Sequence, residues 1–447
     1  MSPGPFMHRR RFLQALGASL GATVPARPAS PADFTLRIQP ITVELSPKHR
    51  IKTIGYNGSA PGPLLRMPAG KTVSINVFNQ TDTAEIVHWH GLHIPSNVDG
   101  SMEEGTPMIA AHDSARYSFT AAPSGTRWYH THQSAGKNLN RATYTGQFGF
   151  FYIEPAHEPG DYDAEYFLAL KEWDPYWTDA GDSLDVAYQR FSINDRALGY
   201  GEPLRVKEGQ RVMLRILNAS ATNLRRIAFA GHRFRVLALD GNPVANPREV
   251  DVLELGPAER VDAQVTMNAP GVWILGATDD HDREAGMGIV VEYAGQTGLP
   301  VWHPASSAPW DYASFGTAGS PNDSAAPIPL VFRKKFVSAR WQDKWTVNGK
   351  QYPHTDPISV KAGNLYRLIF DNQSDEAHPV HLHRHTFELV KVGGVSTRGV
   401  SKDVVMVGAK SQVEAEFLAN NPGPTLFHCH NQMHMDFGFM TLFDYAS

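Results

Sequence analysis

The sequence contains one cysteine, Cys429, among its 447 residues. A single cysteine cannot form a disulfide within the chain, so it is either an inert core residue or a group that does chemistry. The sequence also lacks a basic block after its N-terminal stretch, and its formal net charge is −4, which disfavours nucleic acid as a partner. No apolar run reaches the roughly 20 residues that a membrane helix requires, so stable insertion into a membrane is not expected.

The N-terminal stretch differs from the rest of the chain and has the layout of a signal peptide. Arg9, Arg10 and Arg11 precede a mildly apolar segment at 12–24, and small residues and prolines follow. "HRRRFLQ" resembles the twin-arginine export pattern, with Arg9 and Arg10 as the pair, and an ordinary secretory signal is the alternative. We therefore predict a signal peptide at 1–32, recognised by the twin-arginine export machinery, and a periplasmic or secreted protein.

Glycine (38) and proline (32) are plentiful and the apolar runs are short, which favours many short strands over long helices. Three stretches resemble one another, at 56–80, 193–219 and 347–373, and each contains an alternating apolar strand that ends in asparagine. In every copy a glycine precedes that asparagine by nine positions: Gly70 and Asn79, Gly209 and Asn218, Gly363 and Asn372. Such a repeat at domain-sized intervals predicts an all-β chain with three β-sandwich domains of one kind.

The repeat also predicts the domain boundaries. We expect the first domain at 33–155, the second at 156–300 and the third at 329–447. The stretch 301–328 is rich in Pro, Ser and Ala and is expected to be a linker. The second copy lacks the histidine pairs that the other two carry at equivalent places, so we predict a metal-free domain that acts as a spacer.

Eight of the twenty histidines form four His-x-His pairs. Residues two apart on a strand point to the same face, so each pair aims two imidazoles at one place. Imidazole suits copper, zinc, iron and nickel, and four pairs near the two ends of the chain exceed chance. The pairs are His88 and His90, His130 and His132, His381 and His383, and His428 and His430.

Cys429 stands between two of these histidines, His428 and His430, in "HCHNQMH". On a strand, the cysteine faces away from its two neighbours, so this short piece can contact two metal sites. Cys429 and His434 offer a thiolate and an imidazole, and the isolated His378 is the candidate for the second imidazole. A Cys and two His with a weak axial partner is the blue-copper arrangement. An electron accepted there can pass along the backbone into either flanking histidine.

"HWHG", "WYHTH", "HPVHLH" and "HCHNQMH" occur in the order of the four copper-binding motifs of the multicopper oxidases. The chain resembles this family, which includes laccases, over its whole mature length. The resemblance implies three cupredoxin-like Greek-key domains, four copper ions, a small-molecule reducing substrate that docks near His434, and O2 reduced to water between the first and third domains. It implies type 1 ligands His378, Cys429 and His434, type 2 ligands His88 and His381, and type 3 ligands His90, His130 and His430 at one copper and His132, His383 and His428 at the other.

The chain departs from the family pattern at three positions. Phe439 occupies the axial position and cannot coordinate, which predicts a high-potential type 1 site, and the adjacent Met440 is expected to point away. Met435 stands where many bacterial relatives have a glutamate thought to relay protons, which leaves Asp99 as the proton-donor candidate, or as a plain turn residue. Arg384 replaces a glycine, and we expect it to reshape the approach to the cluster or to pair with a surface acid.

The residues thus favour a laccase-type oxidase of phenols or aromatic amines. The alternatives are a Cu(I) or Mn(II) oxidase for metal resistance and a non-catalytic scaffold protein that has lost its copper ligands. All the expected ligands are present, which disfavours the scaffold. A copper nitrite reductase is disfavoured because it would have two repeats. His93 and His385 extend two of the pairs but match no ligand, so they are expected near the ligands or at the surface.

Overall fold

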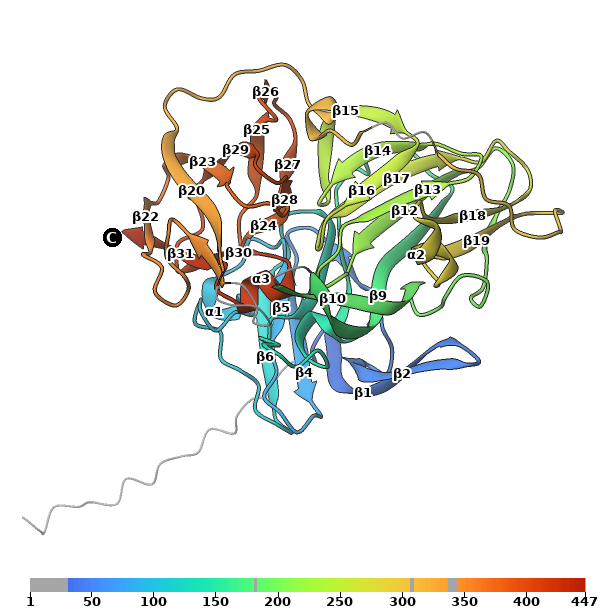
Figure 1. The fold of residues 1–447 in the computed structure, drawn as a ribbon, viewed down its shortest axis with the longest axis horizontal. Helices are drawn as coiled ribbons and strands as arrows, with labels where there is room; N and C mark the ends of the chain where they lie inside the picture. Colours follow the sequence, from blue (N-terminus) through green and yellow to red (C-terminus); the bar gives the residue numbers. More distant parts are fainter. Residues whose placement is uncertain (1–30, 181–182, 306–308, 337–343, 447) are drawn as a thin grey trace, which may run out of the picture. The chain divides into compact units, whose positions relative to one another are not determined.

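The computed structural model describes residues 31–180, 183–305, 309–336 and 344–446 (Figure 1). The predicted signal peptide therefore lies almost wholly outside the described residues. Strands dominate the described part of the chain, which confirms the all-β prediction. Among the described residues, no helix combines the length and the apolar character needed to cross a membrane.

The strands and short helices follow the three sequence copies. The first copy contains β1 (Phe34–Ser46), β2 (His49–Tyr56), β3 (Leu65–Pro68), β4 (Thr72–Asn79), β5 (Val87–His90), α1 (Ser96–Asp99), β6 (Ser114–Thr120), β7 (Gly125–Thr131), the 3₁₀ helix η1 (Ala142–Tyr144) and β8 (Phe148–Glu154). The second contains β9 (Ala164–Ala180), β10 (Ser183–Ile193), β11 (Leu204–Val206), β12 (Arg211–Asn218), β13 (Arg225–Phe229), β14 (Phe234–Leu239), β15 (Asn242–Val250), β16 (Val252–Leu255), β17 (Arg260–Thr266), β18 (Val272–Ala277), α2 (Asp280–Glu284) and β19 (Gly288–Tyr293). The third contains β20 (Ala326–Lys335), β21 (Lys344–Val347), β22 (Ile358–Lys361), β23 (Leu365–Asn372), β24 (His378–Leu382), β25 (Phe387–Val392), β26 (Val395–Ser396), β27 (Ser401–Lys402), β28 (Val404–Val407), β29 (Gln412–Leu418), β30 (Thr425–Cys429), α3 (Gln432–Asp436) and β31 (Met440–Ala446).

The predicted linker has structure of its own. It contains the 3₁₀ helix η2 (Tyr312–Phe315), and β20 begins at Ala326, inside the stretch that we expected to be linker. The hydroxyl of Tyr312 donates to Glu259 Oε1 at 2.6 Å, which fastens the segment to the second copy. The exact boundaries between the copies stay a prediction.

The three copies share one topology. In each, a parallel strand pair gains an antiparallel neighbour: β1, β4 and β6; β9, β12 and β17; β20, β23 and β29. The partner sheets run β3-β8-β7-β5, β11-β19-β18-β13 and β22-β31-β30-β24. The histidine-bearing strands β5 and β24 therefore occupy equivalent places, and so do β7 and β30. The equivalent strands of the second copy are β13 and β18.

The repeated glycine and asparagine have the same structural role in each copy. The glycine adopts a left-handed conformation, which a residue without Cβ takes at little cost; φ is 79° at Gly70, 81° at Gly209 and 83° at Gly363. The asparagine is buried at the end of its strand, and its amide donates to the carbonyl of the following turn. These bonds run from Asn79 to Thr83 (2.7 Å), from Asn218 to Asn223 (2.9 Å) and from Asn372 to Glu376 (2.7 Å).

The cores follow from the alternation of apolar residues. On β4, Val73, Ile75 and Val77 are buried, and they pack with residues from the partner sheet, such as Trp89 and Phe151, in one core. On β12 the prediction of alternation was too simple, because nearly every residue of that strand is buried. One face of β12 packs in the core of its own sandwich, and Leu217 on the other face packs with Trp128 and Phe148 of the first copy.

Candidate metal centre

The first candidate site combines Cys429 with two histidines from different elements. Cys429 Sγ lies 3.5 Å from Nδ1 of His434 and 3.8 Å from Nδ1 of His378, and all three side chains are buried. The side chain of Asn431 accepts hydrogen bonds from the backbone N–H groups of Met433 and His434, so it caps α3. The helix consequently starts directly after β30 and returns His434 toward Cys429.

The remaining histidines lie opposite one another on paired strands. His88 on β5 faces His130 on β7, and His381 on β24 faces His428 on β30. The ring of His88 stacks on that of His383, with 4.0 Å between the centroids, and His90 stacks on His381 at 3.9 Å. The first and third copies thus bring their histidine pairs into one buried cluster, as the sequence predicted.

Within this cluster the ring nitrogens converge in two triplets. His130 Nε2 lies 3.3 Å from His90 Nδ1 and 3.4 Å from His430 Nε2. In the second triplet, His428 Nε2 lies 3.1 Å from His383 Nε2 and 3.5 Å from His132 Nε2. Two nitrogens about 2 Å from one tetrahedral metal ion are about 3.3 Å apart, so both triplets have the spacing of a shared ion.

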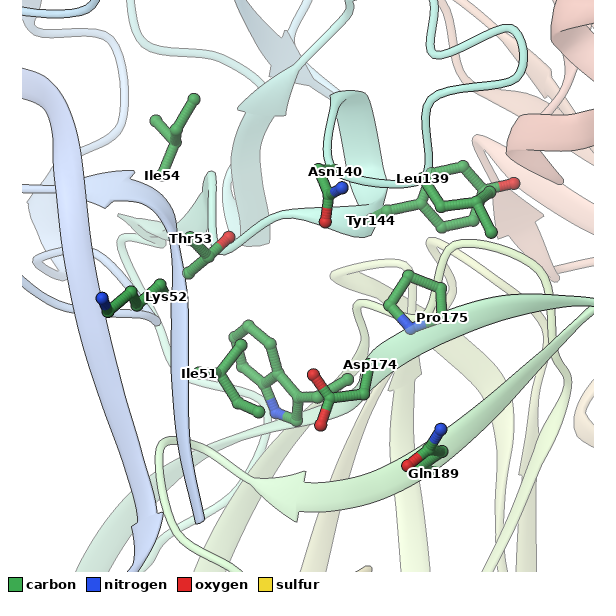
Figure 2. Close-up of a pocket in the computed structure, with 11 residues that line it drawn as sticks. Ile51, Lys52, Thr53, Ile54, Leu139, Asn140, Tyr144, Asp174, Pro175 and Gln189 are labelled. Atoms are coloured by element: carbon green, nitrogen blue, oxygen red, sulfur yellow. The ribbon is translucent and has the colours of Figure 1, made fainter.

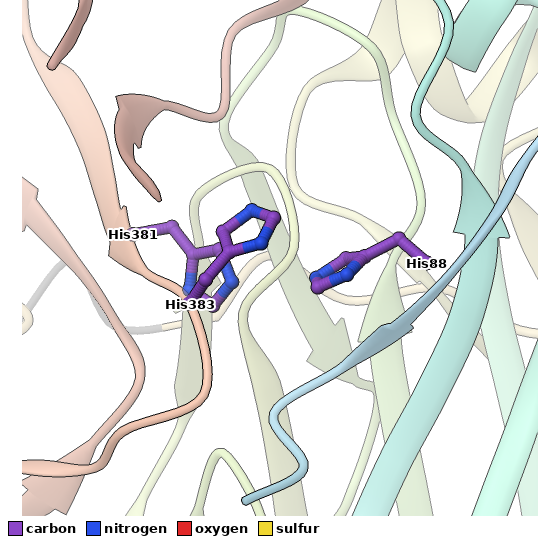
Figure 3. Close-up of side chains that lie close together, drawn as sticks. All are labelled: His88, His381 and His383. Atoms are coloured by element: carbon purple, nitrogen blue, oxygen red, sulfur yellow. The ribbon is translucent and has the colours of Figure 1, made fainter. Parts of the chain in front are cut away.

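A third set consists of His88 and His381. The Nε2 atoms of both residues are buried and have no hydrogen-bond partner. Figure 3 shows His88 facing His381 and His383 from the opposite strand, and one ligand atom from each of the three lies within 4.8 Å of the others. Buried polar atoms are rarely left unpaired, so two such nitrogens side by side indicate a place for a cation.

The opposite ring nitrogens are held by the protein, which sets the tautomer and the direction of each ring. His88 Nδ1 donates to Asp99 O (2.9 Å), His130 Nδ1 to Thr131 O (2.8 Å), His381 Nδ1 to Asp403 O (2.7 Å), His383 Nδ1 to Asp99 Oδ2 (2.8 Å) and His428 Nδ1 to Cys429 O (2.9 Å). The Nε2 lone pairs of these five rings are therefore available to metal ions.

Burial also keeps the cluster neutral. Desolvation, aided by neighbouring imidazoles, lowers the pKa of His132 to about 4 and that of His430 to about 3. The same causes hold the pKa of five further histidines well below its usual range: His90, His130, His381, His383 and His428. Burial raises the pKa of the Cys429 thiol, which favours the protonated form. A bound metal ion would displace this proton, because the thiolate is the ligand.

Two acids contact His383 in this cluster, and only Asp99 was expected from the sequence. Asp99 Oδ2 lies 2.8 Å and Glu104 Oε2 lies 3.2 Å from Nδ1 of His383. Burial acts to raise the pKa of Asp99, but the contacts with His88, Glu104 and Arg384 outweigh it and the pKa is lowered. Burial and the charge of Asp99 raise the pKa of Glu104 well above its usual range. Glu104 therefore holds a proton more firmly than Asp99 does.

Sequence reasoning also missed Asp403, which precedes β28. Its Oδ1 lies 3.1 Å from Nε2 of His90, and its backbone carbonyl accepts from His381. Its carboxylate receives both arms of Arg260, at 2.6 Å each, and one from Arg127 at 3.3 Å. Arg260 comes from β17 of the second copy, a contribution that the description of that copy as a spacer omitted. No local pattern marks Asp403, because the partners of its carboxylate are 143 to 313 residues away.

The structure shows what surrounds Arg384 and Met435, two of the positions that depart from the family pattern. Arg384 is fully buried, so the expectation of a surface acid was wrong: its Nε lies 3.5 Å from the buried Glu104. The guanidinium of Arg384 also donates to Gly423 O and Thr425 Oγ1. Met435 lines a small cavity of about 10 Å³ beside four cluster histidines. Met440 packs with Leu426 and Met435, away from Cys429, as predicted.

His93 and His385 lie near the cluster. His93 Nε2 is 2.9 Å from Thr386 Oγ1. His385 donates from Nδ1 to His383 O at 3.0 Å, and its Nε2 is 2.7 Å from the hydroxyl of Tyr445. Both histidines are therefore held by neighbouring polar groups.

The outer edge of the Cys429 site is formed by His434 and its neighbours. The indole of Trp345 covers one face of His434, with 4.2 Å between the centroids. His434 Nε2 donates to Glu376 Oε2 at 3.1 Å, and Glu376 also accepts from Lys334 Nζ at 2.8 Å. The Glu376 side chain is 38% exposed, so a carboxylate connects this buried imidazole to the surface.

A larger cavity of about 540 Å³ lies elsewhere, between β2, β9, β10 and the segment around η1 (Figure 2). Lys52, Asp174 and Gln189 line it together with the indole of Trp173. Its lining includes none of the histidines described above, so we do not assign the metal chemistry to it.

The site residues fit copper. The donor set of the first site is one sulfur and two imidazole nitrogens, which copper favours in electron-transfer sites. The second site offers eight imidazoles, with two unpaired nitrogens and two triplets at metal-ligand spacing. No exposed side chain is needed to complete either set, so water is largely kept out.

Comparison with known proteins gives consistent matches. The family models described as "Multicopper oxidase" match residues 37–158, 177–294 and 327–447. "Multicopper oxidase MmcO" of Mycobacterium tuberculosis is 32% identical over 472 residues, which cover 96% of this chain and 90% of that protein. "Laccase-4" of Thanatephorus cucumeris is 28% identical over 84% of this chain and 82% of its own length.

Solved structures match the fold. The crystal structure of a multi-copper oxidase from Pseudomonas Thermotolerans superimposes with a TM-score of 0.74 at 24% identity, covering 93% of this chain and all of that one. The three sandwiches therefore have the cupredoxin-like architecture that the sequence predicted.

Proposed function

The chain belongs to the multicopper oxidase family, and we propose that it is a laccase-type enzyme that oxidises phenols or aromatic amines one electron at a time. The family assignment makes it a copper-dependent oxidoreductase that uses O2. The substrate class is our inference, and it depends mainly on the surroundings of Cys429.

Four copper ions are proposed, held by the three sets of ligands. Cys429, His378 and His434 would hold the type 1 ion, and His88 and His381 the type 2 ion. The two nitrogen triplets would hold the type 3 pair. When bound, copper would supply one-electron oxidation of the donor at the first site and reduction of O2 by four electrons at the second.

The chain itself connects the two sites. His428 and His430 are joined to Cys429 by single peptide units, and the imidazoles of both point into the cluster while Sγ points at His378 and His434. A continuous covalent path therefore leads from the thiolate to both triplets. Asp99 accepts from Nδ1–H of His383 through Oδ2, and its buried Oδ1 has no hydrogen-bond partner among the described residues, so Asp99 is positioned to take up a proton and release it beside the cluster.

Phe439 is the observation that favours phenolic donors. Its ring is fully buried against His378 and Trp345, and it offers no lone pair to the thiolate site. A site without an axial ligand has a higher potential, because the axial donor stabilises the oxidised ion. A high potential suits phenols and aromatic amines, which are harder to oxidise than cuprous ions.

Oxygen uptake by the copper-loaded protein tests this proposal. We expect four copper ions per chain, an intense blue absorption band, and oxygen uptake with phenols and aromatic amines. Cys429→Ser should lose the band and the uptake together while keeping the copper of the cluster. A blue protein that consumes oxygen only with metal ions would contradict the laccase assignment.

A metal oxidase is the second candidate, and Glu376 favours it. This half-exposed carboxylate touches His434, and a carboxylate next to the electron entry point suits Mn(II) as a ligand. If metal ions are the donors, Glu376→Gln should raise KM for them severalfold and leave KM for a neutral phenol unchanged. Equal effects on both donors would remove this candidate.

We further propose export to the periplasm or beyond by the twin-arginine machinery, on the strength of Arg9 and Arg10. Replacing both with lysine should retain the precursor inside the cell, which fractionation and immunoblotting would detect. Export of that variant at the normal rate would favour the ordinary secretory route.

A further inference from the structure

We propose that Arg260 is a positioning residue for the histidine cluster and that it acts from the second copy through Asp403. This inference rests on the proposed copper function, since it concerns how two ligands of the cluster are aimed. Among the described residues, Arg260 has no hydrogen bond to a cluster histidine; it holds the carboxylate that does.

Asp403 is linked to one histidine from each of the two metal-bearing copies. Its Oδ1 lies 3.1 Å from Nε2 of His90, so the Nε2–H donates outward and Nδ1 turns toward His130. Its backbone carbonyl accepts from Nδ1 of His381 at 2.7 Å, which leaves Nε2 unpaired in the cluster. Asp403 thus leaves Nδ1 of His90 and Nε2 of His381 available to metal ions, although the two rings are stacked.

Arg260 fixes Asp403 in that position. The guanidinium places Nη1 2.6 Å from Oδ1 and Nη2 2.6 Å from Oδ2, a two-pronged contact with both residues fully buried. This fork geometry constrains the plane of the carboxylate, whereas an ammonium group would act as a single point charge. Because Arg127 adds a second cation, the carboxylate is occupied and is not itself a metal ligand.

The second copy also holds the backbone around Asp403. Asp240, at the end of β14, accepts from the N–H groups of Asp403 (3.3 Å) and Val404 (3.1 Å). The other oxygen of Asp240 accepts from the N–H of Arg260 at 2.9 Å. The second copy therefore fixes the backbone carbonyl of Asp403 that orients His381. Arg260 belongs to the same set of contacts and also fixes the carboxylate of Asp403.

Arg215 offers a matched control. It lies on β12, the strand next to Arg260 in the same sheet, and it is also buried and paired with acids. Its partners are Asp262 at 2.9 Å, Glu158 at 3.1 Å and Glu165. An Arg→Lys change at either position removes a buried guanidinium that is bonded to acids, but only Arg260 is bonded to a carboxylate that contacts a cluster histidine.

The test compares Arg260→Lys with Arg215→Lys in the full chain. We would measure the unfolding temperature without copper, the copper retained against a graded chelator, the blue absorption band, and the electron paramagnetic resonance of the type 2 ion. We expect Arg260→Lys to bind cluster copper about 10- to 100-fold more weakly, with an altered resonance and an intact blue band. Arg215→Lys should lose comparable stability without copper and keep both metal signals.

Normal retention and resonance in folded Arg260→Lys would overturn the proposal, and so would equal changes in the two variants. If Arg260→Lys does not fold, Asp403→Asn carries the test, because the amide preserves the shape but cannot accept both arms of the guanidinium. Unchanged cluster copper in Asp403→Asn would overturn the proposal as well. An unaltered chain that binds no copper would instead refute the proposed function, so the two failures occur in different proteins.

Discussion

The ring of Phe439 packs edge-on against the ring of His378, with 4.9 Å between their centroids. Phe439 is fully buried, and it also lies against Trp345 and Phe332. The face of the thiolate site where an axial donor would stand is thus closed by hydrocarbon. The neighbouring Met440 belongs to a separate cluster and leaves this face to the phenyl ring.

Phe439→Met should lower the potential of the type 1 site, because the thioether can coordinate weakly from the same place. We expect a drop of about 60 mV or more, equal to a tenfold change in a one-electron equilibrium. A redox titration followed at the blue band measures it. Phe443→Met, a buried phenylalanine of β31, is the control and should leave the potential unchanged. An unaltered potential in Phe439→Met would refute the assigned axial position.

Asp99→Asn should reduce kcat by about 10²-fold or more, the usual contribution of a positioned proton donor. The amide keeps the contact with His383 but cannot take up and release a proton. Glu104→Gln should have a much smaller effect, because burial and the charge of Asp99 favour the protonated form of Glu104 and the amide supplies a donor in its place. Steady-state oxygen uptake at saturating donor compares the two variants. Equal losses would mean that both acids only support the cluster.

Gly100→Ala should disrupt the cluster while leaving the Cys429 site intact. The φ of Gly100 is 98°, and a Cβ there would lie 1.9 Å from Val87 O and 2.4 Å from His88 Cα. Because backbone cannot yield as a side chain can, β5 must shift and carry His88 with it. We expect lower copper content with a preserved blue band. Gly105→Ala, where the added Cβ meets nothing within 4 Å, is the control for left-handed strain.

Lys171 should make stability depend on pH. Burial lowers the pKa of this lysine to about 7, while an unfolded lysine titrates near 10.4. Between those values the unfolded chain binds more protons than the folded chain at this lysine. The contribution of Lys171 to the free energy of unfolding therefore rises with pH by at most about 1.4 kcal/mol per unit. Below pH 7 this contribution does not change. Lys171→Met should flatten this rise, as denaturant titrations of the copper-free protein at pH 7 and 10 would detect. An identical rise in the variant would show that other groups cause it.

Much of the site was predictable from the sequence because strand geometry has a period of two. The pairs around Trp89 and Cys429 had to project their histidines to one face each, and the repeat located the pairs around Trp89 and Leu382 on equivalent strands. The glycine and asparagine of each copy could also be found in the sequence, because their nine-position spacing recurs. The type of fold followed from the same periodicity.

The contacts that surround the ligands were not predictable. Glu104 reaches His383 across 279 residues, and Arg260 reaches Asp403 across 143. Neither contact produces a periodic pattern in the sequence, because each depends on how separate sandwiches pack against one another. The alternative that Arg384 pairs with a surface acid failed for a related reason: a charged residue can be buried when backbone carbonyls and a hydroxyl accept its hydrogen bonds.

The separation between His130 and His430 is 300 residues. During synthesis the histidines of the first copy are made long before those of the third copy. Half of the cluster therefore exists for a time without its partners. At roughly 5–20 residues per second the interval is on the order of 15 s to a minute. Copper that arrives early can occupy only an incomplete set of ligands, and stable loading has to follow the docking of the last sandwich. Maturation of the protein is therefore governed by chain completion before it is governed by metal supply.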